Sequence, residues 1–138
     1  MCGFFISNSK KIGLESEAII RSGLEFRGPD ADSGAIQSNG WTSYHARLSI
    51  IDIATSANQP VINGDGSQLV FNGEILNYQE LGEKYFSRKY TSDTMLLNDL
   101  ILSNNLRLEE LDGFFAFVFI DGAGNLKHAV RDRFGVKP

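Results

Sequence analysis

Residues 114–120 read FFAFVFI, an unbroken apolar run in a chain of 138 residues. A strand with one face in water alternates apolar and polar side chains, whereas this run has no polar position on either side. The run therefore predicts a strand that is buried on both faces. Asp121 and Gly122 begin a turn after it, and a last strand is predicted near 126–131.

The segments before this run predict a mixture of strands and helices. Strands are expected near 2–6, 33–38, 41–47 and 68–71, helices near 14–26, 78–86 and 93–103, and a loop over 52–67. Asn39-Gly40 is a strong hairpin signal, and Pro29 ends the first helix. Because strands and helices do not alternate as βαβ units, the order favours an α+β or layered α/β fold over a doubly wound parallel sheet.

The composition is typical of a globular domain without a nucleic-acid or membrane signature. Apolar residues make up 42% and charged residues 22% of the chain. A net charge of -4 gives no electrostatic reason to bind nucleic acid or an anionic membrane. No apolar segment is long enough to span a membrane. A signal peptide requires a basic residue before a longer apolar stretch, whereas the apolar run at 4–6 is short and no basic residue precedes it. We therefore expect one cytoplasmic domain.

Motifs for metals and nucleotide cofactors are missing from the sequence. It contains no GxGxxG or P-loop pattern and no CxxC or HxxxH spacing. His45 and His128 are far apart and are predicted to be strand residues rather than ligands. Cys2, the single cysteine, cannot form an internal disulfide, so the fold is not expected to depend on oxidation.

Cys2 directly follows the first methionine, and this position has two interpretations. If Met1 is removed, the thiol and a free α-amine belong to the same residue. The amine, with a pKa of about 8, is then a base beside a thiol with a pKa of about 8.5, as in N-terminal nucleophiles. The alternative is a small buried side chain that begins the first strand, and position alone favours this alternative.

Four further residues are candidates for catalysis or substrate binding, and three of them also have a structural interpretation. The Asn72 amide and the Gly73 N–H are suitable donors for an oxyanion, although Asn-Gly is also typical of a hairpin turn. Arg47 is unusual inside an apolar strand and can bind a carboxylate through two hydrogen bonds. Asp93 can bind an ammonium group, although "TSD" before an apolar helix is first of all an N-cap with an acid in the first turn.

Eight segments resemble, in the same order, the class II glutamine amidotransferase domain, and specifically the glutaminase domain of glutamine-hydrolysing asparagine synthetases. They are MCGFF (1–5), RGPD (27–30), HARLSIID (45–52), NQP (58–60), VFNGEILNY (70–78), SDT (92–94), DGFFAFVFID (112–121) and RDRFGVKP (131–138). The resemblance implies a type-2 domain over 1–138 with the N-terminal-nucleophile hydrolase fold. That fold is an α+β sandwich of two antiparallel sheets between helical layers, which we expect to be incomplete at the C-terminus.

The same resemblance implies a role for each matching residue. Cys2 would attack the side-chain amide of glutamine, release ammonia and form a thioester that water hydrolyses. Asn72 and Gly73 would form the oxyanion hole. Substrate would be bound by Arg47 at the α-carboxylate, by Asp93 and Glu74 at the α-amino end, and by Leu48 and Ile50 along the pocket. Leu76 replaces the tyrosine usual in the family, and we expect it to be tolerated because it lies beyond the oxyanion residues.

The resemblance also implies the molecules with which the domain works. The substrate would be L-glutamine, and the partner a synthetase domain or subunit that uses ATP and magnesium to form asparagine from the ammonia. We expect no cofactor within 1–138, and sheet edges without neighbours would favour self-association, including a homodimer. The alternative function is a non-catalytic module that senses glutamine or docks on a synthetase. A third possibility is a structural domain with Cys2 in its core.

Overall fold

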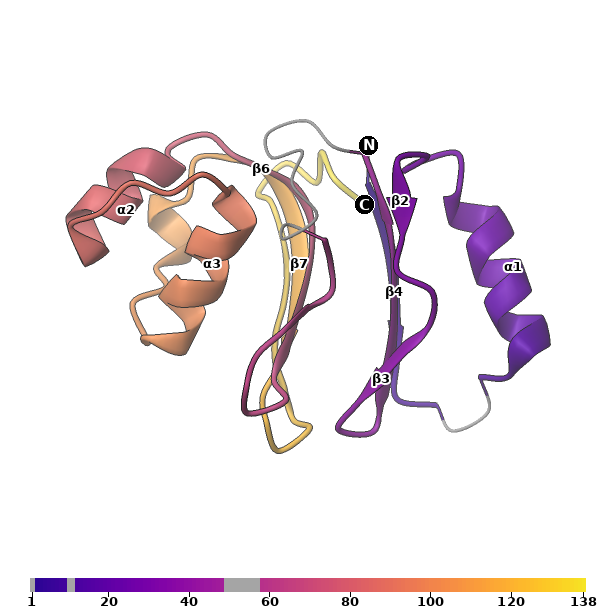
Figure 1. The fold of residues 1–138 in the computed structure, drawn as a ribbon. Coiled ribbons are helices and arrows are strands. Elements are labelled where there is room, and N and C mark those ends of the chain that lie inside the picture. Colours follow the sequence, from indigo (N-terminus) through magenta and orange to yellow (C-terminus); the bar gives the residue numbers. More distant parts are fainter. Residues whose placement is uncertain (1, 10–11, 49–57) are drawn as a thin grey trace.

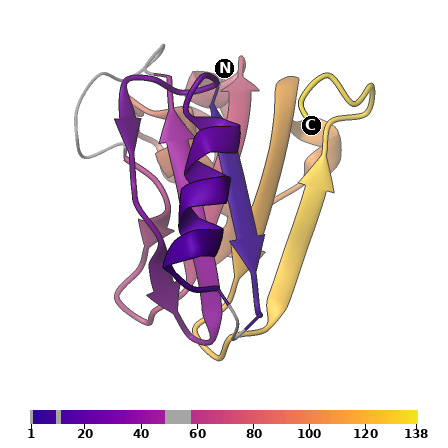
Figure 2. The same cartoon turned by 90° about the vertical axis from the view of Figure 1, so that its right-hand side faces the viewer.

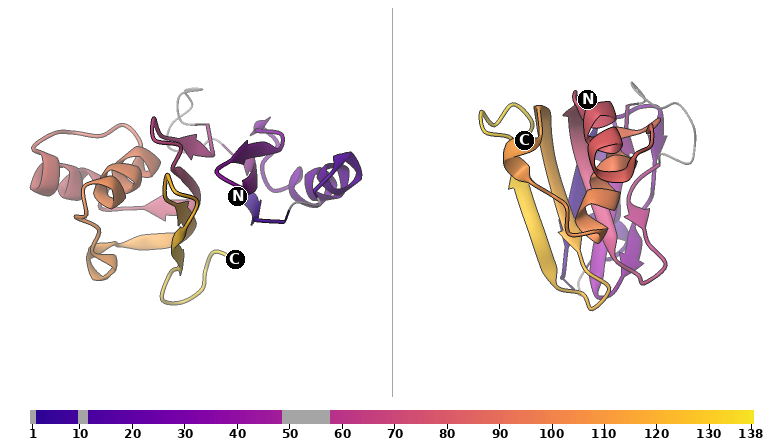
Figure 3. Two further views of the ribbon diagram at one scale, coloured as in Figure 1. Left: turned by 90° about the horizontal axis from the view of Figure 1, so that it is seen from below. Right: turned by 90° about the vertical axis from the view of Figure 1, so that its left-hand side faces the viewer.

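A computed structural model describes residues 2–9, 12–48 and 58–138. Figure 1 shows two sheets that face each other, with helices on the outer side of each. Seen from below in Figure 3, the same four layers follow one another, and the N-terminal helix is farthest from the other two. The expected α+β sandwich of two antiparallel sheets between helical layers is confirmed.

The first sheet is built around the strand that ends at Arg47. Its strands are β1 (Gly3–Ser7), β2 (Ala31–Asp32), β3 (Ile36–Ser38) and β4 (Trp41–Arg47), and β4 pairs antiparallel with the other three. The turn between β3 and β4 has positive φ at Asn39 (48°) and Gly40 (81°), as its sequence predicts. The single strand expected at 33–38 is wrong in detail, because Gly34 has φ 63° and separates β2 from β3.

The second sheet contains the apolar run that predicted the fold. Its strands are β5 (Val61–Ile62), β6 (Gln68–Ile75), β7 (Gly113–Ile120) and β8 (Leu126–Arg131), paired antiparallel in that order. The prediction that 114–120 is buried on both faces is confirmed except at Val118, which is half-buried, and at Phe114, which is 43% exposed. β6 was expected to end at Phe71 but continues to Ile75, because β7 pairs with it along its full length.

The helices agree closely with the predicted ranges. They are α1 (Leu14–Leu24), α2 (Tyr78–Phe86) and α3 (Asp93–Leu102), and a short 3₁₀ turn spans Leu108–Glu110. Ser92 is the N-cap of α3, with its hydroxyl 3.4 Å from the N–H of Met95. α1 covers the outer face of the first sheet, as Figure 2 shows with α1 in front of β1 and β4.

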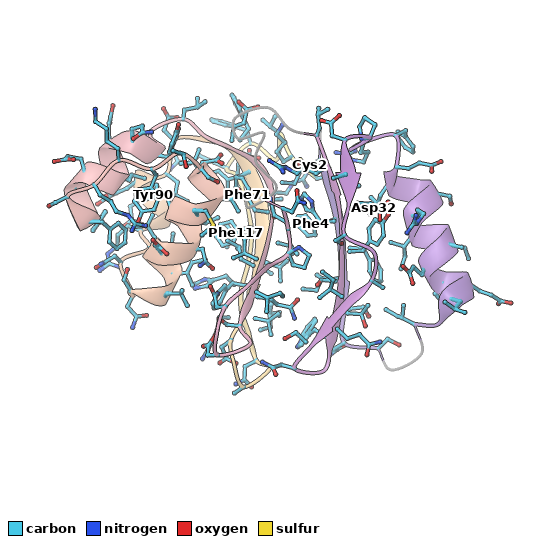
Figure 4. The ribbon with its side chains drawn as sticks, in the orientation of Figure 1. Cys2, Phe4, Asp32, Phe71, Tyr90 and Phe117 are labelled. Atoms are coloured by element: carbon cyan, nitrogen blue, oxygen red, sulfur yellow. The ribbon has the colours of Figure 1, made fainter. Side chains whose placement is uncertain are left out.

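The two faces of the second sheet bury different kinds of side chain. Phe71 and Phe117 point toward α2 and α3 (Figure 4) and form an apolar core with Leu96, Leu97 and the other buried residues of α3. The inner face buries apolar side chains such as Val70 and Ile120 and also makes polar contacts with the first sheet. Ser43 Oγ donates to Gln68 Oε1 at 2.8 Å, and further along the same strands His45 binds the backbone of Phe71. The candidate site lies in this layer between the two sheets.

Candidate functional site

Cys2 lies between the two sheets, where the chain enters β1 (Figure 4). The pairing of Gly3 with Ala46 sets Cys2 opposite Arg47, at the end of β4. The Leu48 N–H donates to Cys2 Sγ at 3.3 Å, and Sγ is 3.4 Å from Leu48 O. Cys2 is only half-buried. It therefore sits at the border of the inner layer, with a backbone donor directed at its sulfur, rather than in the core.

Arg27 is a site residue that the sequence analysis missed, because RGPD was interpreted only as a helix-breaking turn and a family segment. Its Nε donates to the Cys2 carbonyl at 3.4 Å. Its Nη2 is buried and has no hydrogen-bond partner among the described residues. Gly28 makes this approach possible, because a Cβ there would lie 2.3 Å from the backbone of Ala46. No periodicity or spacing marks such a contact, which depends on packing of the turn against β4.

Arg47 is buried, with 8% of its surface exposed, at the end of β4. Its Nη1 donates to Asn58 Oδ1 at 2.6 Å, and both residues line a cavity of about 300 Å³. The structure thus brings the expected carboxylate-binding cation next to Cys2 through strand pairing. Leu48 follows directly and contacts the sulfur, whereas Ile50 lies outside the described residues, as does Met1.

The edge of β6 presents a row of backbone N–H groups. The Phe71 N–H donates to Gln59 Oε1 at 2.6 Å, and the Ile75 N–H donates to Asp93 Oδ2 at 3.0 Å. Alternate residues of an antiparallel strand turn their backbone groups to the same side. The Gly73 N–H therefore points to this same edge, between the two groups that side chains already bind. It is a donor that a bound molecule can reach without breaking the β6–β7 pairing.

Gly73 also has little space around its α-carbon. Its φ is 157°, and a Cβ would lie 2.1 Å from the Phe114 carbonyl oxygen on β7. The residue opposite, Phe115, binds Asp132 instead: its N–H donates to Oδ2 at 3.2 Å, and its carbonyl accepts from the Asp132 N–H at 2.7 Å. This agrees with a close pair that exchanges no backbone hydrogen bonds.

Asn72 is 2% exposed and pairs with Ala116 in the middle of the sheet. The hairpin-turn interpretation of Asn72-Gly73 is therefore wrong. Asn72 lines a cavity of about 530 Å³ together with Gly3 and Arg27. The amide proposed from sequence as an oxyanion donor is thus on the side of β6 that faces the start of β1, where Cys2 lies.

Asp93 joins the start of α3 to the edge of β6. It is 5% exposed, and its carboxylate accepts from the Ile75 N–H at 3.0 Å and from the Thr94 N–H at 2.8 Å. Burial raises the pKa of Asp93 above its ordinary value, the two backbone donors oppose this change, and the nearby Glu74 carboxylate adds to it. A cation placed between Asp93 and Glu74 would stabilise both carboxylates, so the pair is suited to an ammonium group.

His45 is a buried, neutral imidazole between the sheets. It is 1% exposed, and its Nε2 is 3.1 Å from Phe71 O. A carbonyl oxygen only accepts, so Nε2 carries the proton and Nδ1 is bare; Nδ1 has no partner among the described residues. Burial, with a smaller contribution from Arg47, lowers the pKa of His45 to about 4. His45 and Asp32 of β2 both line the cavity of about 300 Å³ that Arg47 also lines.

This pKa predicts a loss of stability in mild acid. The unfolded histidine, with a pKa of about 6.5, binds a proton before the folded one, so its contribution is complete above pH 6.5 and falls toward pH 4. We expect a loss of about 2 kcal/mol between pH 8 and pH 5 from this residue. Urea unfolding of the wild type and of His45→Gln at both pH values measures it. Equal pH dependence in the two proteins would contradict a buried neutral His45.

The described ranges lack the features of a metal site and of a membrane-spanning helix. No group of three His, Cys, Asp or Glu side chains there could hold a metal ion. None of the described helices combines the length and apolar character needed to cross a membrane. The expectation that 1–138 needs no cofactor stays a prediction.

Comparisons with known proteins agree on one family. A family model described as "Glutamine amidotransferase domain" matches residues 1–138. The chain is 34% identical to the glutamine-hydrolyzing asparagine synthetase 3 of Bacillus subtilis, over all of the chain and 24% of that protein. It is 33% identical to a probable glutamine-hydrolyzing asparagine synthetase of Acanthamoeba polyphaga mimivirus, over all of the chain and 27% of that protein. With the asparagine synthetase of Asparagus officinalis it shares 40% identity over 83% of the chain and 20% of that protein. The chain thus spans about a quarter of the length of these curated relatives.

Proposed function

This chain belongs to the glutamine amidotransferase domain family, and we propose that it hydrolyses L-glutamine to L-glutamate and ammonia with Cys2 as the nucleophile. The observation that supports this most strongly is the meeting of three distant segments. Cys2 directly precedes β1, and Arg47 ends β4 beside it. The Gly73 N–H lies on an edge of β6 that no other described strand covers, in the sheet that faces them. A nucleophile, a cation and an oxyanion donor are the groups that amide hydrolysis requires.

The first step is activation of the thiol. After removal of Met1, the α-amine of Cys2 takes the thiol proton, directly or through water, and Sγ attacks the side-chain amide carbon of glutamine. The carbonyl π-bond opens and its oxygen becomes an oxyanion. The Asn72 amide and the Gly73 N–H are the donors we assign to that oxygen, because both lie on β6 next to the nucleophile strand.

The second step releases ammonia and then glutamate. The C–N bond breaks, the proton held by the α-amine goes to the leaving nitrogen, and Cys2 is left as a thioester. A water molecule then loses a proton to the amine and attacks the thioester carbon, the C–S bond breaks, and the thiol is restored. One water is consumed and one ammonia is released for each glutamine. The same oxyanion donors serve both steps.

Substrate orientation is assigned to buried charges of opposite sign. Arg47 would bind the α-carboxylate, and Asp93 with Glu74 the α-ammonium group, while Leu48 and Ile50 line the wall. Arg47 and Asp93 are each more than nine-tenths buried, and charge pairs that exclude water are stronger than exposed ones. The relatives' names further support transfer of the ammonia to a synthetase domain or subunit that makes asparagine. That this synthetase uses ATP is proposed from the family resemblance alone.

Hydrolysis and labelling of Cys2 test this function together. We expect the purified protein to release glutamate from glutamine and to have a mass that lacks one methionine. A glutamine-like diazoketone should alkylate Cys2, and glutamine at ten times its Kd should slow the alkylation about tenfold. Binding of glutamine without hydrolysis by folded protein would replace the proposal with the glutamine-sensing alternative. Equal labelling with and without glutamine would contradict a substrate pocket at Cys2.

A further inference from the structure

We infer that His45 and Gln59 form a clamp on the backbone of Phe71 that positions the oxyanion donors of β6 against the nucleophile strand. This inference rests on the proposed function, in which Asn72 and Gly73 are those donors. His45 and Gln59 would be positioning residues, because they act on the strand and not on the substrate.

The clamp binds both backbone groups of one residue. Gln59 Oε1 accepts from the Phe71 N–H at 2.6 Å, and His45 Nε2 donates to Phe71 O at 3.1 Å. Gln59 is 8% and His45 1% exposed, so water does not compete freely for either bond. Charge-neutral hydrogen bonds in such a dry environment fix backbone geometry well.

The clamp replaces a missing strand neighbour. β5 pairs with β6 only at Gln68 and Leu69, so no strand of the described part of the chain lies beside that edge of β6 from Val70 onward. The N–H and C=O of Phe71 point to this edge, and each would cost about 1–3 kcal/mol if buried without a partner. Side chains satisfy them without covering the next groups along the edge, which belong to Gly73. A longer β5 would have bonded to Gly73 and blocked its N–H.

The clamp also joins the strand of the proposed nucleophile to the strand of the proposed donors. His45 is on β4 and pairs with Phe4 of β1. Two positions further along, on the same face of the sheet, Arg47 lies opposite Cys2. Figure 4 shows Phe4 and Phe71 on the two facing sheets. A shift of Phe71 therefore moves the donors directly after it relative to Cys2, because they are on the same strand.

His45 is a costly way to hold the sheets together if holding is all it does. Its Nδ1 is buried without a partner among the described residues, which costs about 1–3 kcal/mol. Ser43 Oγ donates to Gln68 Oε1 at 2.8 Å between the same two strands, so the sheets have another polar tether. The hydrogen bond from His45 differs from the one made by Ser43 in the residue that it reaches, because Phe71 immediately precedes Asn72.

Substitution of the clamp is expected to lower kcat and leave KM nearly unchanged. His45→Leu removes the donor and Gln59→Met removes the acceptor at similar volume. We expect kcat for glutamine hydrolysis to fall about 10- to 100-fold in each variant, which is at most the lower end of the loss caused by removing one oxyanion donor. KM should stay within about threefold of the wild-type value. His45→Gln keeps an N–H donor at similar reach and should recover at least part of the rate.

Ser43→Ala is the matched control, because it removes an inter-sheet hydrogen bond of the same strand pair farther from Asn72. It should lose comparable stability and keep its kcat. An equal fall of kcat in Ser43→Ala and His45→Leu would overturn the clamp, since any loosening of the sheets would then suffice. No fall of kcat in folded His45→Leu and Gln59→Met would overturn it as well.

Amide hydrogen exchange separates failure of the clamp from failure of the proposed function. In His45→Leu, exchange at the Phe71 and Asn72 amides should become at least about tenfold faster, while Ser43→Ala leaves both unchanged. A wild type that hydrolyses no glutamine but shows this exchange pattern would refute the function and keep the clamp. Unchanged exchange in His45→Leu would refute the clamp whatever the activity; if that variant does not fold, Gln59→Met provides the same comparison.

Discussion

Cys2→Ala is expected to lower the rate of glutamine hydrolysis by about 10⁴-fold or more, because no other described side chain beside the site can form the thioester. Its fold should be retained. Cys2 is only half-buried, and its sulfur is a weak donor and acceptor in the two hydrogen bonds with Leu48. Glutamate release measures the rate, and calorimetric titration with glutamine should give a Kd within a few-fold of the wild type, since Arg47 and Asp93 remain.

Cys2→Ser is the matched control for this result. Serine keeps a small side chain after Met1, so methionine removal and the terminal amine are preserved, but its hydroxyl is far less acidic than a thiol. We expect hydrolysis to remain severely reduced and glutamine binding to persist. Residual activity above about one per cent in Cys2→Ala would contradict a Cys2 nucleophile, and loss of glutamine binding in both variants would show that the change disturbs the pocket.

The elements of this fold could be predicted from the sequence because their signals are local. The apolar run at 114–120 and the spacing of Leu96, Leu97 and Leu100 predict a strand and a helix within two residues of the observed ends. Ser92 was predicted as an N-cap from its place before that helix, and its hydroxyl accepts from the Met95 N–H. Such signals depend only on residues a few positions apart, so they can be recognised in the sequence without knowledge of the fold.

The Asn72-Gly73 dipeptide shows where local signals fail. It is typical of a hairpin turn, yet β7 pairs with both residues and keeps them in an extended strand. The signal that separates the two interpretations is in Phe115 and Ala116, more than 40 positions away. Non-local pairing therefore overrode turn propensity, and the same pairing turned the Gly73 N–H toward a free edge.

The contacts around Cys2 were also beyond prediction from residue spacing. Arg27 reaches the Cys2 carbonyl because Gly28 packs on β4, and neither residue carries a periodic signal. His45 was correctly predicted as a strand residue, but its bond to Phe71 crosses between sheets over 26 positions. Family resemblance supplied Arg47 and Asp93 with roles; the structure adds what surrounds them and why they are buried.

Gly73→Ala is expected to disrupt both the β6–β7 pairing and the proposed oxyanion donor. A Cβ would lie 2.1 Å from Phe114 O and 2.6 Å from the Phe115 α-carbon, and the φ of 157° is itself unfavourable for alanine. Strain and overpacking together should destabilise the protein by about 3–5 kcal/mol. In the fraction that folds, displacement of the Gly73 N–H should lower kcat about 100- to 1000-fold. Urea unfolding and glutamate release, corrected for the folded fraction, measure the two effects.

Gly113→Ala separates strain from loss of the donor, because Gly113 is in the reciprocal position on β7. Its φ is 151°, and a Cβ would lie 2.0 Å from Glu74 O, so the steric conflict arises between the same two strands. We expect a similar loss of stability, because strain and overlap are comparable, but a fall in kcat of no more than about tenfold, since the new methyl group is on the strand that carries no proposed donor. Equal losses of kcat in the two variants would mean that the Gly73 N–H has no special role and that strand pairing alone limits the rate. A tenfold or larger difference at matched stability would assign that difference to the donor, because the strand pair, the type of strain and the substitution are the same in both variants.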